Sequence, residues 1–484
     1  MRTSFVVATA GLAAGAFGCG DGGPGPRSGS LAVESTRPAS GATGVEAGTT
    51  VQAYFNRALN PATVDVTTFT LSTGGTSLTS QVTYDAASQA AVLSGPLLPG
   101  RTYDATVLTG IRDVGGTALP AAHAWSFTTR TWQPVAVDQT GTVGRYSSLA
   151  VDASGHVHVS YFDDTNGELK YATCAASCTT AANWQSIAVD QGGVGAYASL
   201  ALDRSGGLHV SYSDVSLNDL KYATCAASCT TAGNWATVAV DQSGFVGDYT
   251  SLAVDGSGRV HVSYSDGTNV DLKYATCAAS CATAANWQTV VVDQTGFVGA
   301  YTSLAVDGSG RVHVSYQGDA DLKYATCPAG CTVAANWTNV AVDQTGYAGA
   351  YSSLAVDGSG RLHVSYFEET KGDLRYATCA ADCTTAANWQ TVAADETGDI
   401  GYSASLAVDG SGRLHVSYAD FTNGDLKYAT CAADCTSPGS WQTTALDHTG
   451  NLGGEDYTSL AVDPSGGVHV SYFDDTNGDL KYIR

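Results

Sequence analysis

The sequence predicts an all-β protein in two parts, a β-sandwich followed by a seven-bladed β-propeller that is closed by its own N-terminal strand. One phrase, Ser-Leu-Ala-Val-Asp-x-Ser-Gly-x-x-His-Val-Ser-Tyr, recurs seven times with small variations. Each unit of about fifty residues contains four strand-like runs, which is the size of one propeller blade. The chain also stops after the third run of its last unit, and a matching fourth run stands in front of the first unit.

The spacing of the repeat supports this fold. Its leucine falls at Leu149, Leu200, Leu252, Leu304, Leu354, Leu406 and Leu460. In the first unit we expect strands over Ser148–Asp152, His156–Tyr161, Leu169–Thr173 and Trp184–Asp190, each a short apolar or alternating run. The Asp-x-Ser-Gly turn between the first two strands has the residues that a tight turn needs, and we interpret it as structural.

The two ends of the repeat region predict how the ring closes. The last unit ends at residues 480–484, and the missing fourth strand is Trp132–Asp138. Pairing these two segments would cover edges that are otherwise exposed. The alternative is an open solenoid of seven units, which would need capping units at its ends. We assign residues 131–484 to the propeller.

The first part has a different pattern, with strand-like runs at 50–55, 68–72, 81–85, 90–93, 102–108 and 123–128. It resembles the SbsA-type bacterial Ig-like domain over residues 31–130. The resemblance rests on the segments Pro38–Val45, Phe55–Leu59, Leu98–Tyr103, Asp113–Gly116 and Trp125–Thr129. It implies a spacer or surface-presentation module without catalytic activity, in which Trp125 and Phe127 belong to the core.

The N-terminus predicts export. Residues 1–19 combine Arg2 with the apolar stretch Phe5–Phe17 and end in Gly18-Cys19, which resembles a bacterial lipobox. This implies lipidation at Cys19, followed by a Gly/Pro-rich tether over residues 20–30. The alternative is an ordinary signal peptide. We therefore expect a protein of the bacterial cell envelope, on the outer surface or in the periplasm, attached to the membrane through this lipid alone; the alternative is a secreted protein.

Cysteine usage fits that compartment. Twelve of the 13 cysteines form six Cys-x-x-x-Cys pairs, and the one left over is Cys19. We expect disulfides Cys174–Cys178, Cys225–Cys229, Cys277–Cys281, Cys327–Cys331, Cys379–Cys383 and Cys431–Cys435. Zinc is the alternative, but each pair would lack two of four ligands.

One histidine per unit lies in the second strand, at His158, His209, His261, His313, His363, His415 and His469. These side chains form either a ring of metal ligands or a set of buried histidines hydrogen-bonded between blades. Blade-to-blade spacing is too wide for several of them to meet at one ion, so we expect the second arrangement.

The loop between the second and third strands is acidic. It contains Asp163 and Asp164 in the first unit and Asp474 and Asp475 in the last, each followed by Thr-Asn-Gly. Asn-Gly is a strong hairpin signal. Several carboxylates so close together would also suit Ca²⁺, although the glycine is one position too early for an EF-hand loop. We expect no cofactor, with calcium as the alternative.

The link from one unit to the next reads Asp-Gln-Thr-Gly-x-x-Gly-x-Tyr at Asp293–Tyr301, with close versions in most units. Propeller topology places these links on the same face as the acidic loops, and the turns and Cys loops on the opposite face. The tyrosines of the links are candidate ligand contacts, together with the four aspartates above: Tyr146, Tyr197, Tyr249, Tyr301, Tyr351 and Tyr457. Tyrosine beside Asp and Asn suits a sugar, and it suits packing between blades equally well.

The charge limits the partners. Asp and Glu outnumber Lys and Arg by 45 to 22, which gives a net charge of −23 and excludes the basic footprint of a nucleic-acid-binding protein. We expect a monomeric cell-surface binding or adhesion protein whose ligand is carbohydrate or protein. Catalysis needs unlike groups that converge once, whereas here nearly every polar residue is repeated sevenfold, so we assign no catalytic residue. A structural or protein-interaction propeller and an extracellular glycosidase or lyase remain alternatives.

Overall fold

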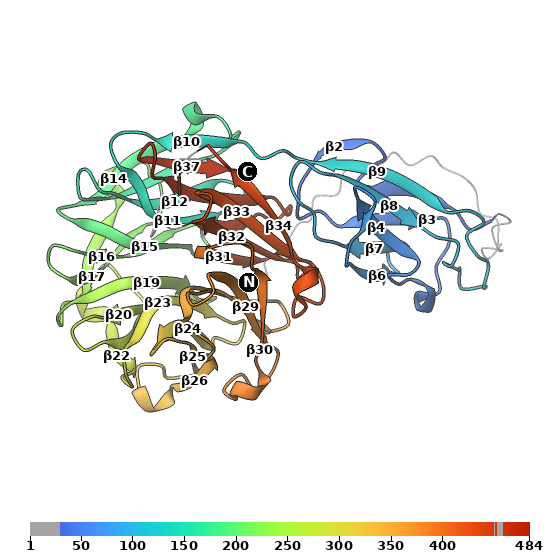
Figure 1. The fold of residues 1–484 in the computed structure, drawn as a ribbon. Helices are drawn as coiled ribbons and strands as arrows, with labels where there is room; N and C mark the ends of the chain where they lie inside the picture. The colour runs from blue at the N-terminus through green and yellow to red at the C-terminus, as the bar shows by residue number, and fades with distance from the viewer. Residues whose placement is uncertain (1–29, 450, 453–457) are drawn as a thin grey trace, which may run out of the picture.

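The computed structural model describes residues 30–449, 451–452 and 458–484, and it folds as two β-rich parts joined near residue 131. Figure 1 shows the N-terminal sandwich beside a larger body built from many small sheets. The predicted lipidation residue Cys19 and the candidate ligand contact Tyr457 lie outside the described residues. No helix among the described residues is long and apolar enough to cross a membrane.

The N-terminal part is a sandwich of two sheets with strand orders β1-β3-β7-β6 and β2-β9-β8-β4-β5. Its strands are β1 (Val33–Arg37), β2 (Ala42–Val45), β3 (Val51–Phe55), β4 (Phe69–Thr73), β5 (Thr76–Ser77), β6 (Gln81–Asp85), β7 (Ala90–Ser94), β8 (Thr102–Val107) and β9 (His123–Thr129), with one 3-10 helix, η1 (Pro61–Thr63). The six strands expected from the sequence are confirmed with shifts of one residue at several ends. The sequence pattern missed β1, β2 and β5.

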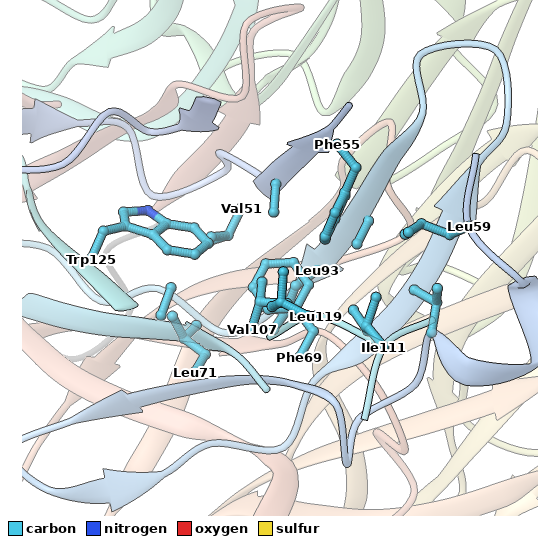
Figure 2. Packing of buried hydrophobic residues seen from close by; sticks show 14 of the residues in the cluster. Val51, Phe55, Leu59, Phe69, Leu71, Leu93, Val107, Ile111, Leu119 and Trp125 are labelled. Atoms are coloured by element: carbon cyan, nitrogen blue, oxygen red, sulfur yellow. The ribbon is translucent and has the colours of Figure 1, made fainter. Parts of the chain in front are cut away.

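The core of this sandwich comes from alternation along its strands. In β3 every second residue is buried, and β8 and β9 show the same period of two. The buried faces bring Phe55, Phe69 and Trp125 together between the two sheets, as Figure 2 shows. Trp125 and Phe127 are 4% and 1% exposed, so both belong to the core as the resemblance implied.

The C-terminal part consists of seven four-stranded sheets. The first four sheets are β11 (Val143–Val151), β12 (Val157–Asp163), β13 (Glu168–Cys174) and β14 (Gln185–Gln191); β15 (Val194–Leu202), β16 (Leu208–Asp214), β17 (Asp219–Cys225) and β18 (Ala236–Asp241); β19 (Val246–Val254), β20 (Val260–Asp266), β21 (Asp271–Cys277) and β22 (Gln288–Asp293); and β23 (Val298–Val306), β24 (Val312–Gly318), β25 (Asp321–Cys327) and β26 (Thr338–Asp343).

The remaining sheets are β27 (Ala348–Val356), β28 (Leu362–Glu368), β29 (Asp373–Cys379) and β30 (Gln390–Asp395); β31 (Ile400–Val408), β32 (Leu414–Asp420), β33 (Asp425–Cys431) and β34 (Gln442–Asp447); and β35 (Ser459–Val462), β36 (Val468–Asp474) and β37 (Asp479–Ile483), which β10 (Pro134–Asp138) joins. Short 3-10 helices precede six of the fourth strands: η2 (Ala181–Asn183), η3 (Ala232–Asn234), η4 (Ala284–Asn286), η5 (Ala334–Asn336), η6 (Ala386–Asn388) and η7 (Pro438–Ser440).

The last sheet contains the front of the domain, as the sequence predicts. β10 pairs antiparallel with β37, with Val135 opposite Tyr482. The first strand of each sheet contacts the first strand of the next, and β35 of the last sheet contacts β11 of the first. The seven sheets therefore pack in a propeller-like ring.

The strand boundaries correct one expectation about the repeat. We expected the first strand to begin at Ser148, with Tyr146 in the link before it. In the structure β11 begins at Val143, and it contains a register shift between Arg145 and Ser148. The tyrosine has a positive φ of 52°, an uncommon backbone conformation for a non-glycine residue. The strand therefore includes the tyrosine, at an irregular point in its pairing with β12.

The ring has two faces. We call the one that carries the links between units and the loops between second and third strands the link face. The opposite one, with the Asp-x-Ser-Gly turns and the Cys loops, is the turn face. The sandwich meets the turn face: Gly48 N donates to Gly466 O (3.0 Å), and the buried Arg413 guanidinium donates to the carbonyl oxygen of Ala47.

Candidate functional site

The candidate tyrosines lie around the axis of the ring. Tyr146, Tyr197, Tyr249, Tyr301 and Tyr351 occupy the same position in five consecutive first strands, and all have φ between 51° and 53°. Neighbouring rings in this series touch, with centroids 4.4–4.7 Å apart. Ser403 takes the same position and the same φ of 53° in the sixth sheet. The tyrosines therefore form one continuous arc and do not make a separate site on each blade.

Burial and mutual contact decide the chemistry of this arc. Burial, followed by the neighbouring hydroxyls of Tyr146 and Tyr249, raises the pKa of Tyr197 well above its ordinary value. Burial likewise raises the pKa of the Asp248 carboxyl, while a hydrogen bond from Ser213 (3.0 Å) opposes it. The arc consists of neutral phenols at ordinary pH. It offers hydroxyl groups and ring edges, not charge.

The tyrosines of the arc and serine and threonine side chains of the first strands line an axial cavity of about 150 Å³. Seven of these serines each accept a hydrogen bond from the leucine N–H of the following sheet, at 2.9–3.0 Å: Ser148, Ser199, Ser251, Ser303, Ser353, Ser405 and Ser459. The last of them accepts from Leu149 and so joins the seventh sheet to the first. This ring of hydrogen bonds holds the first strands together around the axis.

A second set of hydroxyl pairs joins neighbouring sheets. The second-strand serine of one sheet pairs with a serine or threonine of the next at 2.7–3.0 Å in five places: Ser211 with Thr250, Ser263 with Thr302, Ser315 with Ser352, Ser417 with Thr458, and Ser471 with Ser147. In the second and sixth sheets, Ala198 and Ala404 stand where this partner would be. The second-strand serines of the preceding sheets, Ser160 and Ser365, are 1% exposed and have no hydrogen-bond partner.

The repeated histidines sit toward the turn face, and six of them bridge a tyrosine hydroxyl and the aspartate of the turn, whereas Nε2 of His158 in the first sheet has no hydrogen-bond partner. In the second sheet Nδ1 of His209 shares a hydrogen bond with the Tyr222 hydroxyl (2.5 Å), and Nε2 lies 3.3 Å from Asp203 of the turn. Burial lowers the pKa of His209, and Asp203 only partly offsets it. All seven histidines make the tyrosine contact within their own sheet. Our expectation of hydrogen bonds between blades was therefore wrong about the partner, because antiparallel pairing brings the third strand beside the second.

The tyrosine bonded to each histidine makes the contact between sheets. Its ring packs on the tryptophan of the following unit with centroids 5.0–5.4 Å apart, in the pairs Tyr171–Trp235, Tyr222–Trp287, Tyr274–Trp337, Tyr324–Trp389, Tyr376–Trp441, Tyr428–Trp132 and Tyr482–Trp184. The seven pairs join every sheet to the next one, including the seventh to the first. The histidines and tryptophans thus have structural contacts in every unit.

The aspartate that begins each link also makes structural contacts, with the following sheet. Asp138 accepts hydrogen bonds from Lys170 Nζ (2.5 Å) and the Tyr161 hydroxyl (2.7 Å) of the following sheet. Burial would raise the pKa of the Asp138 carboxyl, but the bonds from Lys170, Thr140 and Tyr161 outweigh it and lower the pKa to about 2. Six units use lysine in this role, and the fifth uses Arg375, 3.4 Å from Asp343. These lysines were not predicted as a set from the sequence, although a Leu-Lys-Tyr motif recurs in the third strands.

The acidic loops divide into buried and exposed carboxylates. Asp163 and Asp474 are 1% exposed, and each accepts a hydrogen bond from the side-chain amide of the asparagine three residues later, at 3.0 and 2.8 Å. Lys481 lies 2.6 Å from Asp474. Asp164 and Asp475 are exposed. We expected all four on one binding surface, but only these two present their side chains there, because the first carboxylate of each loop closes the hairpin.

No group of three His, Cys, Asp or Glu side chains suited to a metal ion occurs in the described part of the chain. In the two acidic loops the buried carboxylates are already bonded to amide and ammonium groups. Exposed carboxylates alone would therefore have to hold calcium there.

The six Cys-x-x-x-Cys pairs are disulfides, as predicted, at Cys174–Cys178, Cys225–Cys229, Cys277–Cys281, Cys327–Cys331, Cys379–Cys383 and Cys431–Cys435. Each lies between the third and fourth strands on the turn face. The indole N–H of the following tryptophan donates to the carbonyl oxygen of the second cysteine, at 2.8 Å in the case of Trp184 and Cys178. The disulfide and this bond fix the short connection to the fourth strand.

Comparison with protein families identifies one part of the chain. Residues 28–129 match the model of the family described as a bacterial Ig-like domain. The sandwich is therefore a bacterial Ig-like domain. No curated protein matches the sequence. This domain and the six disulfides are consistent with an extracellular or surface protein.

Several solved structures are similar to the chain. A protein of unknown function from Dyadobacter fermentans is 12% identical, with 72% of this chain and 97% of that chain covered and a TM-score of 0.46. The NanB sialidase from Streptococcus pneumoniae is 11% identical, with 90% and 93% covered and a TM-score of 0.41. The hydrazine synthase of Kuenenia stuttgartiensis is 8% identical, with 70% and 95% covered and a TM-score of 0.46. Likenesses at these levels carry no conclusion about activity.

Proposed function

We propose that the chain is a bacterial surface-binding protein in which a closed seven-bladed β-propeller, held on an Ig-like spacer, binds carbohydrate through its link face. The observation that carries the proposal is that the repeat has two sets of polar residues, one buried and one exposed. The repeated lysines, histidines and their aspartate partners are buried in contacts that recur around the ring. The link face keeps exposed aromatic, carboxylate and hydroxyl groups.

The closed ring is supported by three independent sets of contacts that each run through all seven sheets: the serine–leucine bonds, the tyrosine–tryptophan pairs and the aspartate–tyrosine bonds. An open solenoid would leave the first and last units without these partners. Gly48 and Ala47 of the Ig-like domain contact Gly466 and Arg413 on the turn face of the ring. In the described residues its hydrogen bonds to the ring are all at the turn face, which leaves the link face open for a ligand.

The same contacts argue against an enzyme. A chain of aspartate, histidine and tyrosine resembles acid–base machinery, but it is repeated in six units, with its histidine half-buried or fully buried and its tyrosine packed on a tryptophan. A catalytic centre needs unlike groups that converge on one accessible point. We therefore assign no catalytic residue and no cofactor.

The alternative function is a protein-interaction propeller without a small ligand. A glycan array probed with the purified protein separates the two. Saturable binding to one or a few glycans supports the carbohydrate proposal, and capture of a protein partner with no glycan bound overturns it.

Lipid attachment at Cys19 is a separate proposal about how the protein is held at the envelope. It rests on the resemblance of residues 16–19 to a lipobox and on Cys19 being the cysteine left outside the six disulfides. Mass spectrometry of the mature N-terminus tests it. A diacylglyceryl or triacyl mass on Cys19 supports it, and an unmodified N-terminus overturns it.

A further inference from the structure

The link face carries an unusual group of exposed apolar side chains. Within the ring, the large hydrophobic residues that stand out from the described surface are Val215, Leu217, Phe245, Val270, Phe297, Tyr347 and Val333. All of them except Val333 lie in the links or the second-to-third-strand loops around the second to fifth sheets. Exposed apolar side chains gathered on one side of a soluble domain commonly mark a contact surface.

Three of these residues are aromatic and occupy one repeated position. Phe245, Phe297 and Tyr347 precede the first strands of three consecutive sheets, and they are 50%, 75% and 59% exposed. At the same position the other links have Thr142, Gly193, Asp399 and Asn451. The histidine, tyrosine and tryptophan positions described above recur in most or all units, whereas this aromatic position is confined to three consecutive links.

The loops that present these rings are held firmly. Phe245 N donates to Thr268 Oγ1 (2.7 Å), and Gly267 N donates back to Phe245 O (2.7 Å). Phe297 and Asp319 exchange two bonds of 2.9 Å in the same way. A ring held by a fixed backbone loses little conformational entropy when a ligand covers it.

The fold does not need the aromatic side chain at this position. Thr142 N donates to Thr165 Oγ1 (2.7 Å), which is the same bond that Phe245 makes with Thr268. Asp399 and Asn451 make it as well, at 2.8 Å. Since the backbone contact forms with four different side chains, the exposed rings have no evident role in folding.

The surroundings restrict what can cover the rings. Exposed carboxylates stand beside them, including Asp319 and Glu369, and the whole chain carries a net charge of −23. An anionic polymer would be repelled. A sugar unit presents an apolar C–H face that can pack on an aromatic ring and hydroxyl groups that can donate to neighbouring carboxylates.

We propose that Phe245, Phe297 and Tyr347 form an extended stacking surface for a polysaccharide of uncharged or amino sugars on one side of the link face. This inference rests on the proposed carbohydrate function and assigns it a place and a ligand class. It moves the principal contacts from the tyrosine arc, whose rings already pack on one another, to the ends of the links that precede β19, β23 and β27 on the same face.

Affinity gel electrophoresis of the full protein tests the proposal. The uncharged and amino-sugar probes are hydroxyethyl cellulose, galactomannan and glycol chitin, and the anionic probes are alginate and polygalacturonate. We expect at least one of the first group to retard the protein and neither of the second group to do so. The triple variant Phe245→Thr, Phe297→Thr, Tyr347→Thr copies the residue of the first link, and we expect it to bind at least roughly tenfold more weakly.

The control is Val333→Thr, which removes an exposed apolar side chain on the turn face and should leave retardation unchanged. Thermal melting of the triple variant should match the unmodified protein, which shows that the fold is intact. Equal retardation of the two proteins would overturn this inference and leave the proposed function standing. Binding to no polysaccharide and to no glycan on the array would overturn both. Retardation by the anionic probes alone, or a change of oligomeric state in the triple variant without a change in retardation, would also overturn the inference.

Discussion

The two gaps in the hydroxyl pairs between sheets make a quantitative prediction about stability. Ser160 and Ser365 are buried without a hydrogen-bond partner because Ala198 and Ala404 stand where five other units have serine or threonine. The substitutions Ala198→Ser and Ala404→Ser add one hydroxyl group each. The unit with Ser315 and Ser352 shows the intended geometry, with the two oxygens 2.9 Å apart.

The expected gain follows from the value of a buried hydrogen bond. A net contribution of about 1 kcal/mol is typical, and a buried hydroxyl without a partner costs a similar amount or more. Each substitution should therefore raise the free energy of unfolding by about 1 kcal/mol. The two sites lie between different pairs of sheets and share no partner, so the double variant should gain about 2 kcal/mol.

Denaturant unfolding measures this gain as a higher midpoint with an unchanged slope. Ala236→Ser is the matched control, because Ala236 is an exposed strand residue and its substitution should change the midpoint very little. The reverse substitution Ser352→Ala should leave Ser315 without a partner and lower the free energy of unfolding by about 1–3 kcal/mol.

Unchanged denaturant midpoints for both Ala404→Ser and Ser352→Ala would show that the hydroxyl pair contributes nothing to stability. Stabilisation by Ala404→Ser that the control matches would show that the gain comes from serine in a strand and not from the pair. A loss of stability in both serine variants would show that the axial strands have no room for the added oxygen.

Three further predictions follow from the repeated contacts. Burial holds the pKa of all seven second-strand histidines below the ordinary value, so the folded protein binds fewer protons than the unfolded chain. The free energy of unfolding should therefore fall as pH drops below about 6.5, by at most about 1.4 kcal/mol per pH unit for each histidine. Unfolding midpoints that stay level between about pH 8 and about pH 5.5 would contradict this. The double substitution Cys277→Ser, Cys281→Ser should lower the free energy of unfolding by about 2 kcal/mol, the chain-entropy value for so short a loop, and an unchanged denaturant midpoint would count against the disulfide. Chelation of calcium should leave the melting temperature unchanged, because amide or ammonium groups already bind the buried Asp163 and Asp474; a lower melting temperature would support the calcium alternative instead.

Much of the fold could be predicted because the pattern repeats. Seven copies of one phrase gave the number of sheets and the placement of most strands, and the position of Trp132–Asp138 gave the pairing of β10 with β37. The Cys pairs were equally readable, since residues four apart in an export-type sequence have few other partners. Such inferences use only local spacing.

The candidate site was harder to predict, because its residues contact partners in other sheets. Tyr146 was assigned to a link, whereas the register shift in β11 places it in the strand with its ring on Tyr197. Asp163 was expected at the surface, but Asn166 and Lys170 enclose its carboxylate. The aromatic residues Phe245, Phe297 and Tyr347 were not singled out, although their restriction to three links was visible in the sequence.

By itself the sequence determined that the chain carries a sandwich and seven repeated units, and that its cysteines pair within each repeat, because strand period, turn residues and repeat length are properties of neighbouring residues. Only the tertiary structure decided which polar residues of the repeat are buried in contacts between sheets. Lys170 meets Asp138, Ser148 meets Leu200 and Tyr171 meets Trp235, and each of these contacts joins two different sheets. The packing of one sheet on the next thus decides which copies of the repeated polar residues are buried and which stay exposed on the surface.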